Sequence, residues 1–190
     1  MKKTSIAGAI LAVALLFVGC KNEKTVDLEN TNSQETTTIE VDTVAAKKLI
    51  EAEKETLAKP YDENEDAQAA IDKLLLQAKA EGKNIFVQAG GNWCIWCLRF
   101  NDFIEKDSEI KAYIADTYLY YHLNYSKNNK NKDVFNRYVP EAKNLGYPFF
   151  FVLSPEGEVL QVIGSGDLEA NKSYDRAKVM DMFVQNASKK

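Results

Sequence analysis

The pattern of apolar and polar positions changes twice along the chain, and each change marks a segment of a different kind. Ile6–Val18 is an uncharged, largely apolar run that follows Lys2 and Lys3. Residues 21–42 are mainly Asn, Thr, Glu and Ser, with isolated apolar residues and no period that would bury one face. From about Tyr61 onward, apolar residues recur at helical spacing or in short strand-like runs. We therefore predict a leader, a flexible tether and one folded domain.

Within the predicted domain, helical and strand patterns alternate. The first helix would begin after the capping residue Asn64 and end at Gly82, and Pro140 would divide a later helix into two pieces. In chain order, the predicted elements are a helix over 67–78, a strand at 85–87, a helix after residue 97, a helix over 108–116, a strand over 118–125, two helical pieces over 133–145, strands over 149–153 and 158–163 joined by a turn at 154–157, and a closing helix over 174–184. This order predicts an α/β fold, in which helices cover both faces of one central mixed sheet.

Composition and charge are compatible with a folded domain that has a hydrophobic core, and they exclude one class of partner. The chain has 190 residues, of which 45% are hydrophobic, and its formal net charge is −4. This apolar fraction excludes disorder of the whole chain. The acidic balance argues against a protein whose main task is to neutralise phosphates, so we expect no nucleic-acid partner.

The leader ends in Phe17-Val18-Gly19-Cys20, and its apolar run is shorter than the roughly 20 residues that a membrane-spanning helix needs. These four residues resemble the lipobox of bacterial lipoprotein signal peptides. The resemblance implies a signal peptide over 1–19, cleavage before Cys20 and lipidation of its thiol. Residues 20–60 would then hold the lipidated cysteine, the tether and a short helix over Thr43–Lys59. The alternative is an ordinary secretory signal or an uncleaved anchor with an incidental cysteine.

A cysteine pair follows the first predicted strand, in the motif Trp93-Cys94-Ile95-Trp96-Cys97. A thiolate, rather than a thiol, attacks a disulfide, and the N-terminus of a helix stabilises a thiolate. Cys94, at the corner between strand and helix, is therefore the expected nucleophile. Cys97, one helical turn later, is the expected resolving thiol. Both are predicted catalytic residues.

Metal binding is the alternative chemistry for two cysteines. A structural zinc site needs four ligands, and Cys94, Cys97 and His122, the one histidine in the chain, make three. We therefore predict no metal and no cofactor. His122 is interpreted as a residue of the strand over 118–125.

The Trp-Cys-x-Trp-Cys motif after a buried strand, Gly146-Tyr147-Pro148 before a later strand, and the hairpin with its closing helix together resemble the thioredoxin family. The motif is similar to that of periplasmic thioredoxin-like proteins and of domains related to the C-terminal part of DsbD-type proteins. Gly-Tyr-Pro resembles the corresponding loop of disulfide isomerases. The resemblance implies a three-layer, thioredoxin-like domain over residues 61–190.

The resemblance also implies a set of substrate-binding residues. Pro148 would follow a cis peptide bond and face the cysteines, and the backbone of Tyr147 would pair with the substrate chain. Trp93, Ile95 and Trp96 would form the rim of the site. We expect Trp96, which lies inside the motif, to be the more exposed tryptophan, and for Trp93 packing and substrate contact remain equal alternatives.

One position departs from the family pattern. Classical thioredoxins have a buried Asp six residues before the first cysteine, where it helps to move the proton of the resolving thiol. This chain has Gln88 there, and a neutral amide cannot take up a proton at physiological pH. Asp102 and Glu105 are the carboxylates nearest in sequence, but we interpret both as solvated helix residues.

Together these features predict a lipid-anchored thiol–disulfide oxidoreductase of the bacterial cell envelope that faces the periplasm, either a reductase or an isomerase. Its partners would be envelope proteins with disulfides or cysteines, and the membrane through the lipid. Reducing work outside the cytosol would need electrons from across the membrane, for example from a DsbD-type reductase. A disulfide-donating oxidase and a non-catalytic, chaperone-like peptide-binding module remain alternatives.

Overall fold

The computed structural model describes residues 34–187, so the predicted signal peptide, Cys20 and most of the predicted tether lie outside the described residues. The chain divides into two units, residues 1–41 and 42–190. The first unit contributes only the beginning of helix α1 (Gln34–Thr56) to the described part. Among the residues from 34 to 187, no helix is both long and apolar enough to cross a membrane.

Helix α1 begins nearer the N-terminus than the sequence pattern indicated. Residues 34–42, which we assigned to the tether, are helical and continuous with the helix expected from Thr43. The physical reason is that no Gly or Pro occurs between Gly19 and Pro60, and that the second half of the helix is rich in Ala, Glu and Lys. A weak apolar stripe therefore did not mark where the helix starts.

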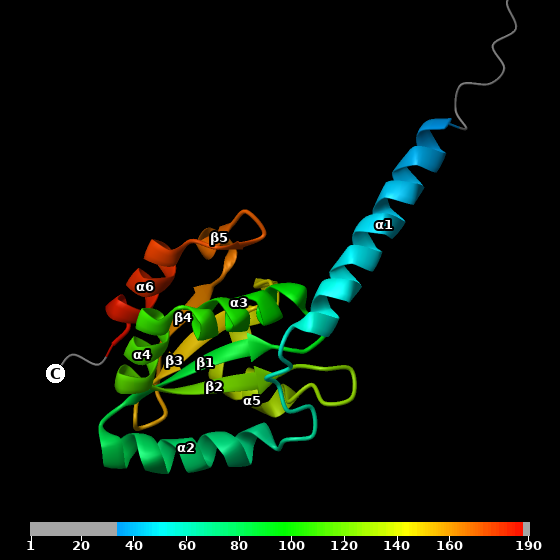
Figure 1. Ribbon diagram of the computed structural model, residues 1–190. Coiled ribbons are helices and arrows are strands. Elements are labelled where there is room, and N and C mark those ends of the chain that lie inside the picture. The colour runs from blue at the N-terminus through cyan, green and yellow to red at the C-terminus, as the bar shows by residue number, and fades with distance from the viewer. Residues whose placement is uncertain (1–33, 188–190) are drawn as a thin grey trace, which may run out of the picture. The chain divides into compact units, whose positions relative to one another are not determined.

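A four-stranded mixed sheet forms the centre of the second unit (Figure 1). Its strands, in spatial order, are β2 (Tyr118–Asn124), β1 (Asn84–Gly90), β3 (Phe149–Leu153) and β4 (Val159–Gly164). Strand β1 is parallel to β2 and antiparallel to β3, and β3 is antiparallel to β4. Helices α3 (Ile95–Lys106) and α4 (Ser108–Thr117) connect β1 to β2. The predicted hairpin and mixed sheet are confirmed, and the connection from β1 to β2 is a parallel crossover.

Two hydrophobic layers hold helices on opposite faces of this sheet. Ile85 and Val87 of β1 pack with residues of α2 (Ala67–Glu81) and α5 (Lys132–Tyr138) on one face. Phe86, between them, packs on the other face with residues of α3, α4 and α6 (Arg176–Gln185). This alternation follows from the two-residue period of a strand. Figure 1 shows α2 on one side of the sheet and α3 on the other.

Two element boundaries differ from the predictions because side chains and a tight turn decide them. Asp66, rather than Asn64, caps α2, since its carboxylate accepts the backbone N–H groups of residues 68 and 69. Gly82 ends α2 in the left-handed conformation, as predicted (φ 65°). Tyr174 lies outside the closing helix, in a small hairpin of β5 (Glu169–Ala170) and β6 (Ser173–Tyr174). The remaining short elements are the 3₁₀ helices η1 (Pro140–Asn144) and η2 (Gly166–Leu168).

Candidate active site at the start of helix α3

The two cysteines of the motif form a disulfide at the N-terminus of α3. Cys94 is the N-cap residue, and its sulfur accepts the backbone N–H of Cys97 at 3.1 Å. The two Cα atoms are 5.3 Å apart. Cys94 is 6% exposed and Cys97 is fully buried. The free N–H groups and positive dipole end of a helix stabilise a thiolate at this position, which suits Cys94 as the attacking sulfur.

The loop before β3 faces Cys94. The peptide bond between Tyr147 and Pro148 is cis, as the family resemblance implied. The carbonyl oxygen of Tyr147 lies 3.5 Å from the Cys94 sulfur, and the next residue, Pro148, is buried. This carbonyl is one of the backbone groups that an extended substrate could reach next to the reactive sulfur.

A shallow groove of about 280 Å³ runs over Cys94. It is lined by Ile50, Lys54, Trp93, Cys94, Ile95, Trp96 and Tyr147. Every predicted substrate-binding residue except the buried Pro148 therefore borders one groove. The two residues from α1 were not expected there, because no pattern in the sequence indicates that this helix approaches the cysteines.

The two tryptophans differ in exposure, and the expected order is wrong. Trp93 is 48% exposed, and its ring N–H donates to the carbonyl oxygen of Tyr125 at 2.6 Å. Trp96 is half-buried, because its ring meets the edge of Tyr174 at 5.8 Å and the guanidinium of Arg99 lies 4.9 Å from its ring centre. The hairpin that carries Tyr174 thus covers Trp96, which sequence position could not show.

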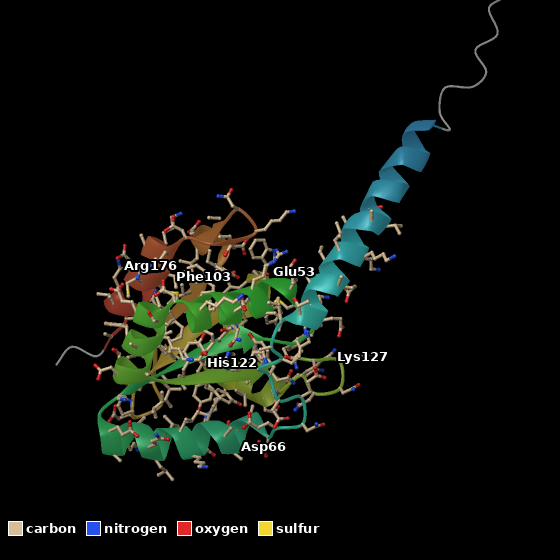
Figure 2. The ribbon with its side chains drawn as sticks, in the orientation of Figure 1. Glu53, Asp66, Phe103, His122, Lys127 and Arg176 are labelled. Atoms are coloured by element: carbon tan, nitrogen blue, oxygen red, sulfur yellow. A yellow bond between two sulfur atoms is a disulfide. The ribbon has the colours of Figure 1, made fainter. Side chains whose placement is uncertain are left out.

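Arg99 also links the start of α3 to α1. Its guanidinium donates to both carboxylate oxygens of Glu53, at 2.7 and 2.6 Å. This hydrogen-bonded pair lowers the pKa of Glu53 and raises that of Arg99. Figure 2 shows Glu53 on the last turns of α1, beside α3.

Beneath Cys97, the side chain of Gln88 is fully buried and hydrogen-bonded at both ends. The Tyr120 hydroxyl donates to its amide oxygen at 2.6 Å. Its amide nitrogen donates to the hydroxyl oxygen of Tyr61 at 2.6 Å and to the carbonyl oxygen of Cys97 at 3.1 Å. The amide therefore anchors the first turn of α3 to the sheet.

Neither nearby carboxylate joins this buried network. Asp102 pairs with Lys106 at 2.8 Å, and Glu105 pairs with Lys111 at 2.7 Å. Both pairs are at least partly exposed, in agreement with their interpretation as solvated helix residues.

His122 lies in β2, opposite Gln88, as predicted for a sheet residue (Figure 2). Its ring packs edge-on against Tyr61 and Tyr120, each at 5.2 Å between ring centres. Burial lowers the pKa of His122 to about 4, so the ring is neutral at physiological pH. In the part of the chain that the structure describes, no three His, Cys, Asp or Glu side chains are grouped as a metal site would require.

Tyr61 is the site residue that sequence analysis missed. It is 3% exposed, packs directly against both cysteines, and precedes α2 by six positions in the sequence. Asn92 holds its backbone, accepting its N–H at 3.2 Å and donating to its carbonyl oxygen at 2.8 Å. An isolated Tyr after Pro60 carries no periodic signal, so only the folded chain reveals its place.

Comparison with known proteins agrees with this architecture. Residues 66–155 match the model of a family described as thioredoxin-like. A solved structure described as a disulphide isomerase from Xylella fastidiosa Temecula1 matches 68% of this chain and 97% of its own, with a TM-score of 0.60 and 23% identity. The domain has a thioredoxin-like fold. This fold, with a disulfide at the start of α3, supports a thiol–disulfide oxidoreductase.

Two further solved structures match the thioredoxin-like domain less fully. One is described as DsbH oxidoreductase, with 22% identity, a TM-score of 0.46 and coverage of 58% of this chain and 77% of that one. The other is a thioredoxin from Thermus thermophilus, with 18% identity, a TM-score of 0.42 and coverage of 60% and 81%. Comparison with curated proteins gave no match.

Proposed function

We propose that the protein exchanges disulfides with client proteins, with Cys94 as the nucleophile and Cys97 as the resolving thiol. The observation that carries this proposal is the position of the Cys94 sulfur. It caps α3, accepts the Cys97 N–H at 3.1 Å and borders an open groove, whereas Cys97 is fully buried. A client disulfide can approach the first sulfur but not the second.

In the reducing direction, the Cys94 thiolate attacks one sulfur of a client disulfide. A bond forms between Cys94 Sγ and that sulfur, and the other client sulfur leaves as a thiolate. The Cys97 thiolate then attacks Cys94 Sγ, which forms the Cys94–Cys97 disulfide and releases the second client thiolate. The client gains two electrons and the protein loses two. The reverse sequence oxidises a client, and reversal after the first step permits isomerisation.

The groove suggests how a client would be held. An extended client segment could pair with the backbone at Tyr147, next to the Cys94 sulfur, in the manner of an added strand. Trp93, Ile95 and Trp96 offer apolar surface around it. Such a site would bind a client mainly through its backbone and its apolar surface. It would therefore accept clients of varied sequence.

We further propose a reductase or isomerase in the bacterial cell envelope, anchored through lipidated Cys20 and facing the periplasm. The sequence of the leader supports this location. Because the envelope lies beyond the cytosolic reductants, sustained reduction would need a membrane protein, such as a DsbD-type reductase, that delivers electrons to Cys94 and Cys97.

Insulin reduction by the wild-type protein and by Cys94→Ser and Cys97→Ser variants tests the exchange activity. We expect turnover only in the wild type, and Cys97→Ser to accumulate a mixed disulfide through Cys94. Client binding that is unchanged in both variants, without turnover in the wild type, would instead indicate a peptide-binding module.

The equilibrium reduction potential of the cysteine pair then tests the direction of the work. A value near or below roughly −230 mV would support a reductase, and one near roughly −120 to −180 mV an oxidase or isomerase. Labelling of cells with a radioactive fatty acid tests the anchor, because Cys20→Ala is expected to abolish incorporation.

A further inference from the structure

The resolving sulfur lies in surroundings that do not favour a charge. Cys97 is fully buried, and an uncompensated thiolate in such a place is costly in free energy. The position that holds a buried carboxylate in classical thioredoxins is occupied by Gln88, so no acidic side chain at this position accepts the Cys97 proton. The resolving step of the proposed function nevertheless needs the Cys97 thiolate.

The hydrogen bonds of Gln88 determine which hydroxyl group near the cysteines still has a proton to donate. An amide oxygen can only accept, so Tyr120 must be the donor in its bond to Gln88. The amide nitrogen therefore faces Tyr61 and must donate to that hydroxyl oxygen. This arrangement leaves the hydroxyl proton of Tyr61 free to be donated elsewhere.

The Cys97 sulfur is a close neighbour of the Tyr61 hydroxyl. A methyl group placed on Gly90 would come 2.6 Å from Cys97 Sγ and 2.7 Å from the Tyr61 hydroxyl oxygen, so both atoms border the same point. Tyr61 and the two cysteines also form one packed cluster. A side chain at Gly90 would clash with both the hydroxyl and the sulfur, so glycine keeps this space open for them.

We propose that Tyr61 donates a hydrogen bond to the Cys97 thiolate, and that the chain Tyr120–Gln88–Tyr61 holds this donor in place. Tyr61 thereby takes over, as a donor that stabilises the charged form, part of the task that a buried base would perform. The inference rests on the proposed function, since it concerns the resolving step of the exchange.

The proton balance of the step follows directly. Cys97 loses its proton to solvent, and Tyr61 keeps its own while it hydrogen-bonds to the sulfur. The thiolate then attacks Cys94 Sγ in the mixed disulfide, a Cys94–Cys97 bond forms, and the client sulfur leaves with the electron pair. Tyr61 is neither oxidised nor reduced.

The groups around Tyr61 remain uncharged at neutral pH, which favours a neutral donor. Burial raises the pKa of Tyr61 far above neutrality and has the same effect on Tyr120 and Tyr174. His122, in edge-on contact with Tyr61, is neutral because burial lowers its pKa. The charges that act on these groups are the Glu105 carboxylate on α3, which influences Tyr120 and His122, and Glu169 and Arg99, which influence Tyr174.

The test is the two-step reaction of the reduced full chain with Ellman's reagent, followed at 412 nm as a function of pH. The first thionitrobenzoate leaves when Cys94 attacks the reagent, and the second leaves when Cys97 resolves the mixed disulfide. Cys97→Ser supplies the background, including any release caused by Cys20. The Cβ chemical shift of carbon-13-labelled, reduced Cys97 gives its pKa independently.

For Tyr61→Phe we expect the Cys97 pKa to rise by about one to two units, the size associated with losing one hydrogen bond to an ion. The first release keeps its rate. For a rise of one unit, the second release slows about threefold at neutral pH. The thiolate fraction of Cys97 falls about tenfold, but a more basic thiolate is a stronger nucleophile, which offsets part of this loss. Tyr120→Phe, which frees the Gln88 amide, is expected to produce a smaller shift in the same direction.

Tyr118→Phe is the matched control, because it removes another buried tyrosine hydroxyl whose bond goes to the Phe183 carbonyl oxygen, away from the cysteines. It is expected to leave both releases unchanged. If Tyr61→Phe has the wild-type Cys97 pKa and second release, the inference is wrong while the proposed exchange stands. If the wild type itself shows no release from Cys94, the proposed function fails.

Discussion

The two sulfurs of the disulfide face two different regions of the molecule. Above Cys94 lies the groove rim, which we define as Trp93, Trp96, Tyr147 and the Glu53–Arg99 ion pair that supports it. It is partly exposed, aromatic and charged. Beneath Cys97 lies the buried network, which we define as Tyr61, Gln88, Tyr120 and His122. Its residues are buried or half-buried, and its side chains are neutral at physiological pH.

Under the proposed function, this contrast would allow two chemically identical thiols to perform different tasks. At the rim, exposure would allow the proposed clients to approach, and the helix N-terminus would stabilise a thiolate at Cys94. In the buried network, charge is costly and hydrogen bonds must be satisfied within the protein, so changes there act on stability and on the resolving thiol. Changes at the rim are expected to act mainly on clients.

The largest expected effect is the pH dependence that buried His122 imposes. Its folded pKa of about 4 lies below the usual value near 6.5, so between these values the unfolded chain binds a proton that the folded chain does not. Stability is therefore lost as the pH falls from about 6.5 to 4, by about 3 kcal/mol in total.

Urea unfolding across this range measures the loss, with His122→Phe as the variant that keeps an aromatic ring but cannot titrate. We expect a flatter profile between pH 6.5 and 4 in the variant. Parallel profiles for the two proteins would show that His122 takes up a proton in the folded state. They would contradict the view that the network disfavours charge while the rim accepts it.

The substitution Gly90→Ala is expected to have the next largest effect, because the added methyl group would lie 2.6 Å from Cys97 Sγ and 2.7 Å from the Tyr61 hydroxyl. Overpacking of this kind is expected to lower the free energy of unfolding by about 2 kcal/mol. Chemical denaturation of the oxidised protein measures it. Gly166→Ala is the control, since no atom lies within 4 Å of its added methyl group, and an equal loss in both would contradict the prediction.

At the rim, Trp93→Ala is expected to raise KM for protein disulfides about tenfold, because exposed tryptophans at binding surfaces often contribute strongly to affinity. Reaction with the small Ellman's reagent and the unfolding free energy are expected to change little. Val184→Ala, at an apolar residue of α6 with 50% exposure, is the control. An unchanged KM would assign Trp93 to packing alone.

Glu53→Gln is expected to have the smallest effect. The Glu53–Arg99 pair is well aligned but partly exposed, so its loss is expected to cost less than about 1 kcal/mol and to matter less at high salt. Thermal unfolding at low and high salt measures this, with Glu55→Gln at an exposed neighbour as the control. A loss of several kcal/mol would place this ion pair among the elements that hold the fold.

The regular parts of the fold could be predicted because their patterns are local and repeated. The strand over Phe149–Leu153 coincides with its prediction, and the run at 85–87 lies inside β1. Pro140 divided the helix as expected. Boundaries set by one side chain or one turn were missed, as at Asp66 and Tyr174, because many polar residues can cap a helix and a two-residue hairpin leaves almost no pattern.

For the candidate site, spacing along the chain placed Cys94 and Cys97 correctly at the start of a helix. The sequence also shows that residue 88 is not a carboxylate, but it does not show which tyrosines form hydrogen bonds with the Gln88 amide. Tyr61 and Tyr120 lie far apart in the sequence, and both bonds exist only after β1 and β2 have paired and the segment before α2 has folded back.

The sequence by itself determined the alternation of helices and strands and the reactive pair, because periodicity and the spacing of two cysteines are properties of neighbouring residues. Tertiary structure decided which sulfur is accessible, which tryptophan is covered and which hydroxyl lies next to Cys97. Exposure, pKa and hydrogen-bond direction depend on what surrounds a group in space. Those surroundings come from residues as distant in sequence as Glu53 and Tyr174.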